Sequence, residues 1–138
     1  MTTYLTSFGS KTLHNGTTHH NATGVNPDSA KAKLDLIELA NGVLFDPNGT
    51  GPAPTVPQPI TVEIVLKYST ATAAETEAES IVALVGTRNT LTAKRLAAGT
   101  TRTCLARLEQ AIDRRRYPQE ASREITLELH FQPLNNWS

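Results

Sequence analysis

Alternation of apolar and polar residues in two separate segments is the feature that most constrains the fold of this chain. In residues 60–68 and 125–131, every second side chain is apolar or aromatic, and the side chains between them are polar except Val65. Successive side chains of a strand point to opposite faces of a sheet, so one face of each segment belongs in a core. We therefore expect a β-sheet with a buried face and a more polar outer face.

A single helix is predicted directly after the first of these strands. Thr72 and Glu75 have the spacing of a capping box, in which each side chain satisfies a backbone donor of the first turn. Gly86 stands where a helix commonly ends. Small and branched apolar residues recur between them with helical spacing: Ala74, Ala78, Ile81, Val82 and Val85. We expect this stripe to pack against the sheet.

The remaining strand candidates are shorter or less regular than these two. They comprise residues 4–7, 11–14, 33–39, 43–45, 90–96 and 101–112, and Asn41-Gly42 indicates a hairpin turn. Strands, one helix and then more strands predict a mainly β (α+β) fold. Its expected form is an antiparallel β-sandwich or barrel flanked by one α-helix, with extended loops or arms.

The length of 138 residues fits a single domain, which we place at residues 1–138. Residues 1–32 are rich in Thr, Ser, Asn, Gly and His, and we expect them to form an arm or extended loop region. Residues 33–138 are then the β core plus the helix. Four prolines in residues 50–59 predict a stiff, extended connector and exclude a central strand there.

Composition and charge favour association with other protein subunits. Apolar residues make up 38% and aromatic residues 5% of the chain, a thin core that partner surfaces can complete. Thirteen basic residues balance 13 acidic ones, so we expect no specific nucleic-acid binding. The basic residues gather locally, however: Arg107, Arg114, Arg115, Arg116 and Arg123. These arginines around 107–123 form either a solvated face or a patch that meets an acidic neighbour or a passing nucleic acid.

The sequence predicts a protein that is made in the cytoplasm and does not enter a membrane. Cys104 is the single cysteine, which excludes an internal disulfide framework. Residues 1–5 have no basic and apolar leader pattern, so we expect no secretory signal. No segment approaches the roughly 20 apolar residues that a membrane helix requires.

No residue pattern predicts catalysis, and we expect no enzyme, catalytic residue, cofactor or metal. His19, His20 and Asp28 contain metal-binding groups, but adjacent residues on an extended chain point in opposite directions. Cys104 falls on the core-facing side of its strand, as a small buried hydrophobe does. The carboxylates of the helix, Glu75, Glu77 and Glu79, are typical of a solvated face.

The layout from residue 60 to residue 137 resembles the N-terminal domain of the distal tail protein family of long-tailed bacteriophages, and the wider tail-tube fold. The resemblance rests on a strand, a helix that ends in Ala83-Leu84-Val85-Gly86, a hairpin into residues 101–108 and the terminal strand 125–132. It implies a β-sandwich or barrel flanked by one helix. It also implies a hexameric ring around a central channel, contacts with adjacent tail proteins, and location in the virion tail.

The functional hypothesis is accordingly a structural subunit of a phage tail that forms a ring at the distal tail or tail tube. A neck, tail terminator or decoration protein would use the same combination of arm and sandwich. A monomeric carbohydrate-binding sandwich is a further alternative, and it would present a row of exposed aromatic side chains. The candidates for such a row are scattered along the chain: Tyr4, Tyr68, Tyr117 and Trp137.

Overall fold

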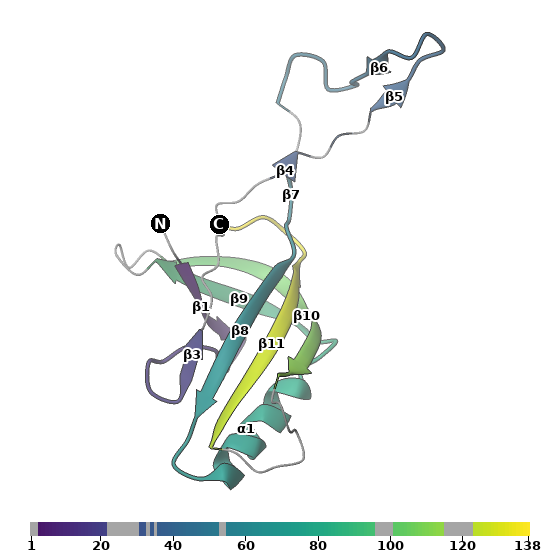
Figure 1. Ribbon diagram of the computed structural model, residues 1–138. Helices are drawn as coiled ribbons and strands as arrows, with labels where there is room; N and C mark the ends of the chain where they lie inside the picture. The colour runs from purple at the N-terminus through teal and green to yellow at the C-terminus, as the bar shows by residue number, and fades with distance from the viewer. Residues whose placement is uncertain are drawn as a thin grey trace.

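The computed structural model describes residues 3–21, 31–32, 34, 36–52, 55–95, 101–114 and 123–138. Its body is a curled antiparallel sheet of seven strands in the order β2-β1-β9-β10-β11-β8-β3 (Figure 1). The strands are β1 (Thr3–Phe8), β2 (Lys11–Thr12), β3 (His19–Asn21), β8 (Ile60–Lys67), β9 (Arg88–Arg95), β10 (Thr101–Asp113) and β11 (Glu124–Pro133). This half-barrel with one helix confirms the predicted fold class.

The core lies on the concave face of this sheet, where β8 and β11 alternate as predicted. Val62, Ile64 and Leu66 of β8 are fully buried, and so are Ile125, Leu127 and Leu129 of the neighbouring β11. The rings of Phe8 and Phe131 lie 5.2 Å apart, which brings β1 and β11 together across the curl. The period-two pattern therefore identified two neighbouring strands of the sheet and the side of each strand that is buried.

Helix α1 (Ala71–Val82) packs against β8 and β11 and buries Ala74, Ala78 and Ile81. Its N-cap is Thr70, whose hydroxyl accepts a hydrogen bond from Ala73 N at 3.2 Å. The helix thus begins earlier than the capping box at Thr72 predicted. The buried stripe is also narrower than expected, because Val82 and Val85 are exposed.

The side chain of Asn21 joins the two edges of the curled sheet. Asn21 lies on edge strand β3, and its Oδ1 accepts a hydrogen bond from Leu5 N of β1 at 3.3 Å. Its Nδ2 donates to Leu5 O at 3.1 Å and to Leu13 O at 2.9 Å. One amide side chain therefore supplies the donor and acceptor that a neighbouring backbone would offer in a closed barrel.

The expected division into an arm at 1–32 and a core at 33–138 is wrong. Strands β1, β2 and β3 belong to the main sheet, and Leu5, Phe8 and Leu13 are buried in the core. The segment is polar in composition, but Leu5, Phe8 and Leu13 reach the core. Residues 22–30, which the predicted arm included, lie outside the described residues.

The arm of the molecule lies instead between residues 31 and 56 (Figure 1). At its base, β4 (Lys31–Ala32) pairs with β7 (Thr55–Val56). Farther out, β5 (Ile37–Glu38) pairs with β6 (Leu44–Phe45) in a hairpin that projects away from the half-barrel. We call residues 36–50 the arm hairpin.

Candidate functional site

The arm hairpin has a defined register and turn. Ile37 lies opposite Phe45, and Glu38 lies opposite Leu44. Leu39 N donates to Val43 O at 2.8 Å, and Gly42 N donates to Leu39 O at 2.9 Å. Gly42 has φ +82°, a left-handed conformation that favours glycine. The hairpin that Asn41-Gly42 predicted is therefore confirmed.

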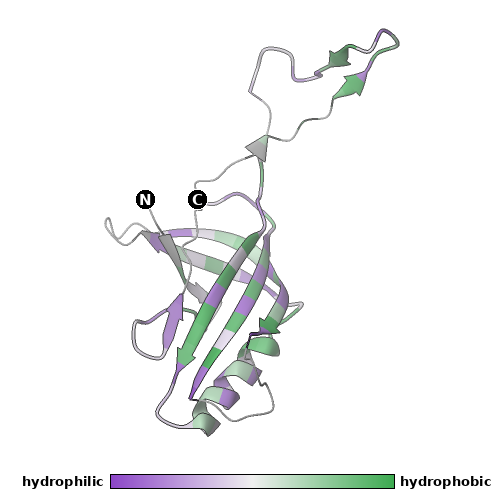
Figure 2. Cartoon of the chain, in the orientation of Figure 1, coloured by the Kyte–Doolittle hydropathy of each residue, from purple (hydrophilic) through white to green (hydrophobic). Residues whose placement is uncertain are grey.

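The two faces of the arm hairpin differ in chemistry. By strand alternation, one face carries only large apolar side chains, which we call the apolar face: Ile37, Leu39, Val43 and Phe45. Their exposed fractions are 53%, 44%, 55% and 50%. By the same alternation, the opposite face carries Leu36, Glu38, Leu44 and Asp46, and we call this the charged face because both carboxylates lie on it. Figure 2 shows the apolar character of β5 and β6 far from the core.

The arm holds most of the exposed apolar surface of the described residues. Seven of the ten large apolar side chains that are exposed lie between residues 34 and 45. At roughly half exposure each, they present a summed apolar area on the order of 500 Å², divided between the two faces of the arm. Large apolar side chains that share one face of a hairpin normally indicate a covered face.

A buried polar cluster lies where β2 and β3 meet α1. Glu77 Oε1 is 3.1 Å from both His19 Nε2 and Lys11 Nζ, and Lys11 Nζ also donates to Ser80 Oγ at 2.9 Å. His19 is only 5% exposed, and its Nδ1 lies 2.8 Å from Thr18 Oγ1. The bonds connect two strands to the helix, so the cluster fastens α1 to the sheet.

The electrostatics of this cluster favour the ionised form of Glu77. Partial burial raises the pKa of Glu77, but the hydrogen bonds from His19 and Lys11 and their charges outweigh it, and the pKa lies below its ordinary value. Burial raises the pKa of the adjacent Tyr68, whose ring packs edge-on against His19 with centroids 6.0 Å apart. This arrangement stabilises an ionised Glu77 that is paired with its neighbours. A carboxylate that acts as a general base near neutral pH has a raised pKa instead.

A second polar cluster lies on the outer face of β8 and β11. Glu128 accepts hydrogen bonds from His130 Nε2 at 2.9 Å and from Arg114 Nη2 at 2.6 Å, and these bonds lower the pKa of Glu128. His130 Nδ1 is 3.3 Å from Thr61 Oγ1 on the adjacent strand. The pairs Arg114–Glu128 and Thr61–His130 cross between strands and are of the kind that stabilise a solvated sheet face, whereas Glu128 and His130 are neighbours on one face of β11.

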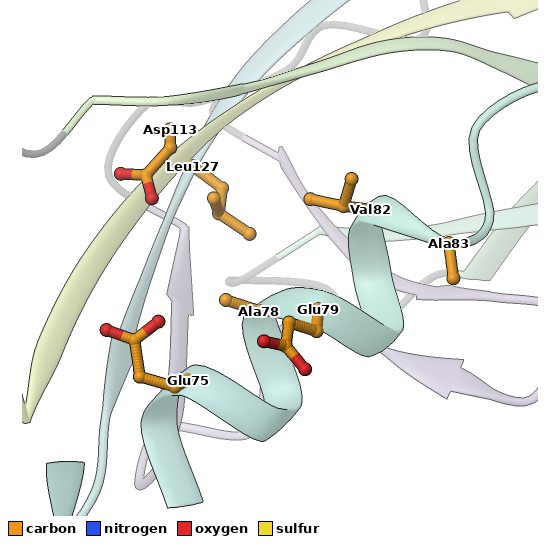
Figure 3. Close-up of a pocket in the computed structure, with 7 residues that line it drawn as sticks. All are labelled: Glu75, Ala78, Glu79, Val82, Ala83, Asp113 and Leu127. Carbon is orange, nitrogen blue, oxygen red and sulfur yellow. The ribbon is translucent and has the colours of Figure 1, made fainter. Parts of the chain in front are cut away.

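An open groove of about 440 Å³ lies beside α1 (Figure 3). Its lining comprises Glu75, Ala78, Glu79, Val82, Ala83, Asp113 and Leu127. The carboxylates stand around an apolar floor that includes Leu127 (Figure 3). The lining offers carboxylates and aliphatic groups but no histidine, cysteine or hydroxyl, and it therefore lacks the usual partners for nucleophilic catalysis.

The structure separates the metal-binding candidates. His19 turns inward to Glu77, whereas His20 Nε2 bonds to Thr17 O at 3.0 Å, and Asp28 lies outside the described residues. In the part of the chain that the structure describes, no three His, Cys, Asp or Glu side chains are grouped to hold a metal ion. Cys104 is buried, and burial raises its pKa to about 11, which disfavours the reactive thiolate.

The arginines near the C-terminal third do not form one patch among the described residues. Arg107 donates to Gly86 O, while Arg114 pairs with Glu128. Arg115 and Arg116 lie outside the described residues. Sequence reasoning missed the bond between His19 and Glu77, because 58 positions separate the two residues and no local pattern connects them.

Comparison with known proteins adds no relative to this description. Searches of protein-family models, curated proteins and solved structures found no match to this chain. Of the helices among the described residues, none has the length and apolar content to cross a membrane. The arm hairpin therefore stands as the candidate functional site on its own geometry.

Proposed function

We propose that this chain is a non-enzymatic structural subunit that assembles with copies of itself into a ring, in the distal tail or tail tube of a long-tailed bacteriophage. The observation that carries the proposal is the apolar face of the arm hairpin. Ile37, Leu39, Val43 and Phe45 share one face of the hairpin, as core residues of a sheet do, yet each is about half exposed. A contact with another copy would supply the cover that the described part of this chain does not.

The energetics of such a contact favour a closed assembly. Burying all seven exposed apolar side chains of the arm, on the order of 500 Å², would yield on the order of 12 kcal/mol at about 25 cal/mol per Å². The apolar face holds four of these seven side chains, so its burial alone yields less. Association itself costs about 4–15 kcal/mol. A single arm contact is therefore near balance at best. A ring in which each subunit gives one arm and receives another gains from simultaneous contacts.

The assignment to a phage tail is supported by the resemblance of residues 60–137 to distal tail and tail-tube proteins. The half-barrel with one flanking helix is the fold that this resemblance implies. Adjacent tail proteins as partners, a sixfold ring and location in the virion are parts of the same proposal. A ring subunit of this kind functions by shape and contact, so it requires no catalytic residue or cofactor.

Oligomeric state with and without a disrupted arm tests the proposal. We expect the unmodified chain to form rings, seen by light scattering and electron microscopy at high protein concentration. Phe45→Asp should remain folded by circular dichroism but monomeric, because a charge replaces an apolar contact. Leu134→Asp is the matched control, since Leu134 is 44% exposed and lies outside the arm. Rings formed by Phe45→Asp, or an unmodified chain that stays monomeric near millimolar concentration, would contradict the proposal.

A further inference from the structure

We infer that the charged face of the arm hairpin binds a specific surface of a second copy, formed by Val85, Arg88 and Arg107. We call this surface the helix-end patch. The inference rests on the proposed function, in that it requires arms to contact other copies of the chain. It concerns Glu38, Leu44 and Asp46 and leaves the apolar face for a separate contact.

The helix-end patch combines an exposed apolar side chain with two arginines. Val85 is 40% exposed and follows the end of α1. Arg107 donates a hydrogen bond to Gly86 O, which places its guanidinium beside the residue that follows Val85. Arg88 lies directly opposite Arg107 in the ladder of β9 and β10, and both side chains are exposed.

The two arginines lack an anionic partner within the described chain. No ion pair joins either one to a described carboxylate. Like charges directly opposite each other on neighbouring strands destabilise a sheet, and an anion between them removes that cost. A guanidinium has five N–H donors, and Arg107 directs one contact to Gly86 O. The pair is thus suited to receive carboxylates.

The charged face of the arm hairpin carries the complementary groups. Leu44 is 58% exposed and lies opposite Glu38 in the hairpin register. Asp46 follows two positions later on the same face, so the two carboxylates flank the leucine. Both bonds that Asp46 accepts from Asn48 go to Oδ1, at 2.9 and 3.3 Å, which leaves Oδ2 for an arginine. A leucine with two carboxylates near it is therefore complementary in charge and polarity to a valine with two arginines near it.

The two surfaces lie on different parts of the molecule. The arm projects away from the half-barrel, whereas the helix-end patch lies on the body where α1 leads into β9 (Figure 1). A contact between two different surfaces is heterologous, and repeated copies of it close into a ring when the rotation permits. The inferred contact is therefore of the type that the proposed ring needs.

Charge reversal on each surface tests the inference. The arm-reversed variant carries Glu38→Arg and Asp46→Arg, and the patch-reversed variant carries Arg88→Glu and Arg107→Glu. We expect each variant alone to associate at least about tenfold more weakly than the unmodified chain, because like charges then face each other. We expect a chain with all four changes to recover association to within about threefold, since the pairs are restored with opposite sign.

Mixing the two reversed variants gives a second readout. Each junction between an arm-reversed and a patch-reversed subunit restores opposite charges, so the mixture should form alternating assemblies of equal composition by native mass spectrometry. Circular dichroism and thermal melting check that each variant is folded. A smaller set of changes, Glu38→Arg on the arm and Arg88→Glu on the patch, tests the same contact while it retains the bond from Arg107 to Gly86.

Three results would overturn the inference, and they can be distinguished from one another. If the reversed variants assemble as the unmodified chain does while Phe45→Asp stays monomeric, the helix-end patch is the wrong surface and the proposed function stands. If the four-change chain and the mixture fail to recover while all variants remain folded, the two surfaces do not face each other. If the unmodified chain forms no assembly, the proposed function itself fails.

Discussion

Single polar side chains connect parts of this fold that are distant in the sequence. Asn21 binds backbone groups of Leu5 and Leu13, and Glu77 binds both His19 and Lys11. Removing one partner leaves the others with unsatisfied groups, which costs roughly 1–3 kcal/mol when they are buried. The apolar fraction is only 38%, so such bonds carry weight in a molecule with a thin core.

We expect Glu77→Gln to lower the stability of the subunit and to change its pH dependence. The folded-state pKa of Glu77 lies below the ordinary 4.5, so the unfolded state binds protons more readily. Ionised Glu77 therefore stabilises the fold above pH 4.5, and this contribution is lost as the pH falls through the lower folded pKa. Glu77→Gln should cost roughly 1–3 kcal/mol at pH 7 and flatten the loss of stability in acid.

Urea unfolding at neutral and acidic pH measures both effects. The Phe45→Asp background, which we expect to be monomeric, separates folding from assembly. Glu79→Gln serves as the control, because Glu79 is an exposed carboxylate on the same helix. An equal response of Glu77→Gln and Glu79→Gln would show that the cluster with His19 and Lys11 does not fasten the helix.

At the scale of elements, local periodicity predicted what the elements are but not what covers them. Strands β8 and β11 and helix α1 follow directly from their apolar spacing. The Asn41-Gly42 turn correctly predicted a hairpin there, but a local pattern cannot say whether the apolar face of that hairpin meets the chain's own core. The sequence also failed to predict three core residues, Leu5, Phe8 and Leu13. They are sparse in a polar segment, so no local pattern marks them, and the pairing of β1 with β9 brings that segment into the sheet.

Two adjacent residues of α1 test which face of the helix is buried. Ile81 is 1% exposed and Val82 is 44% exposed. Ile81→Asp should lower the free energy of unfolding by about 3 kcal/mol or more, because it places an unpaired charge in the core. Val82→Asp should change it by less than about 1 kcal/mol. Thermal and urea unfolding of the monomer distinguish them, and similar losses for both variants would mean that the helix is rotated from the orientation described.

At the scale of the whole molecule, a half-barrel closed by Asn21 supports an arm whose apolar face lies far from the core. The body is held by a continuous buried cluster that includes residues from β1, β8, β10, β11 and α1. Among the described residues, no side chain of the arm hairpin belongs to this cluster. Isolated two-stranded hairpins are at best marginally stable in water, so we propose that a partner surface orders the arm. In this proposal, the partner surface belongs to another copy of the chain.

Hydrogen exchange of the arm hairpin in the free subunit and in the assembly tests that claim most directly. The amides of Leu39 and Gly42, which bond within the hairpin, should exchange fast in the monomer and at least about tenfold more slowly in the assembled particle. The amides of β8 and β11 should be protected in both states and serve as the internal reference. Equal protection of the arm amides in the monomer and the particle would contradict the account, because it would mean that no neighbouring copy covers the arm.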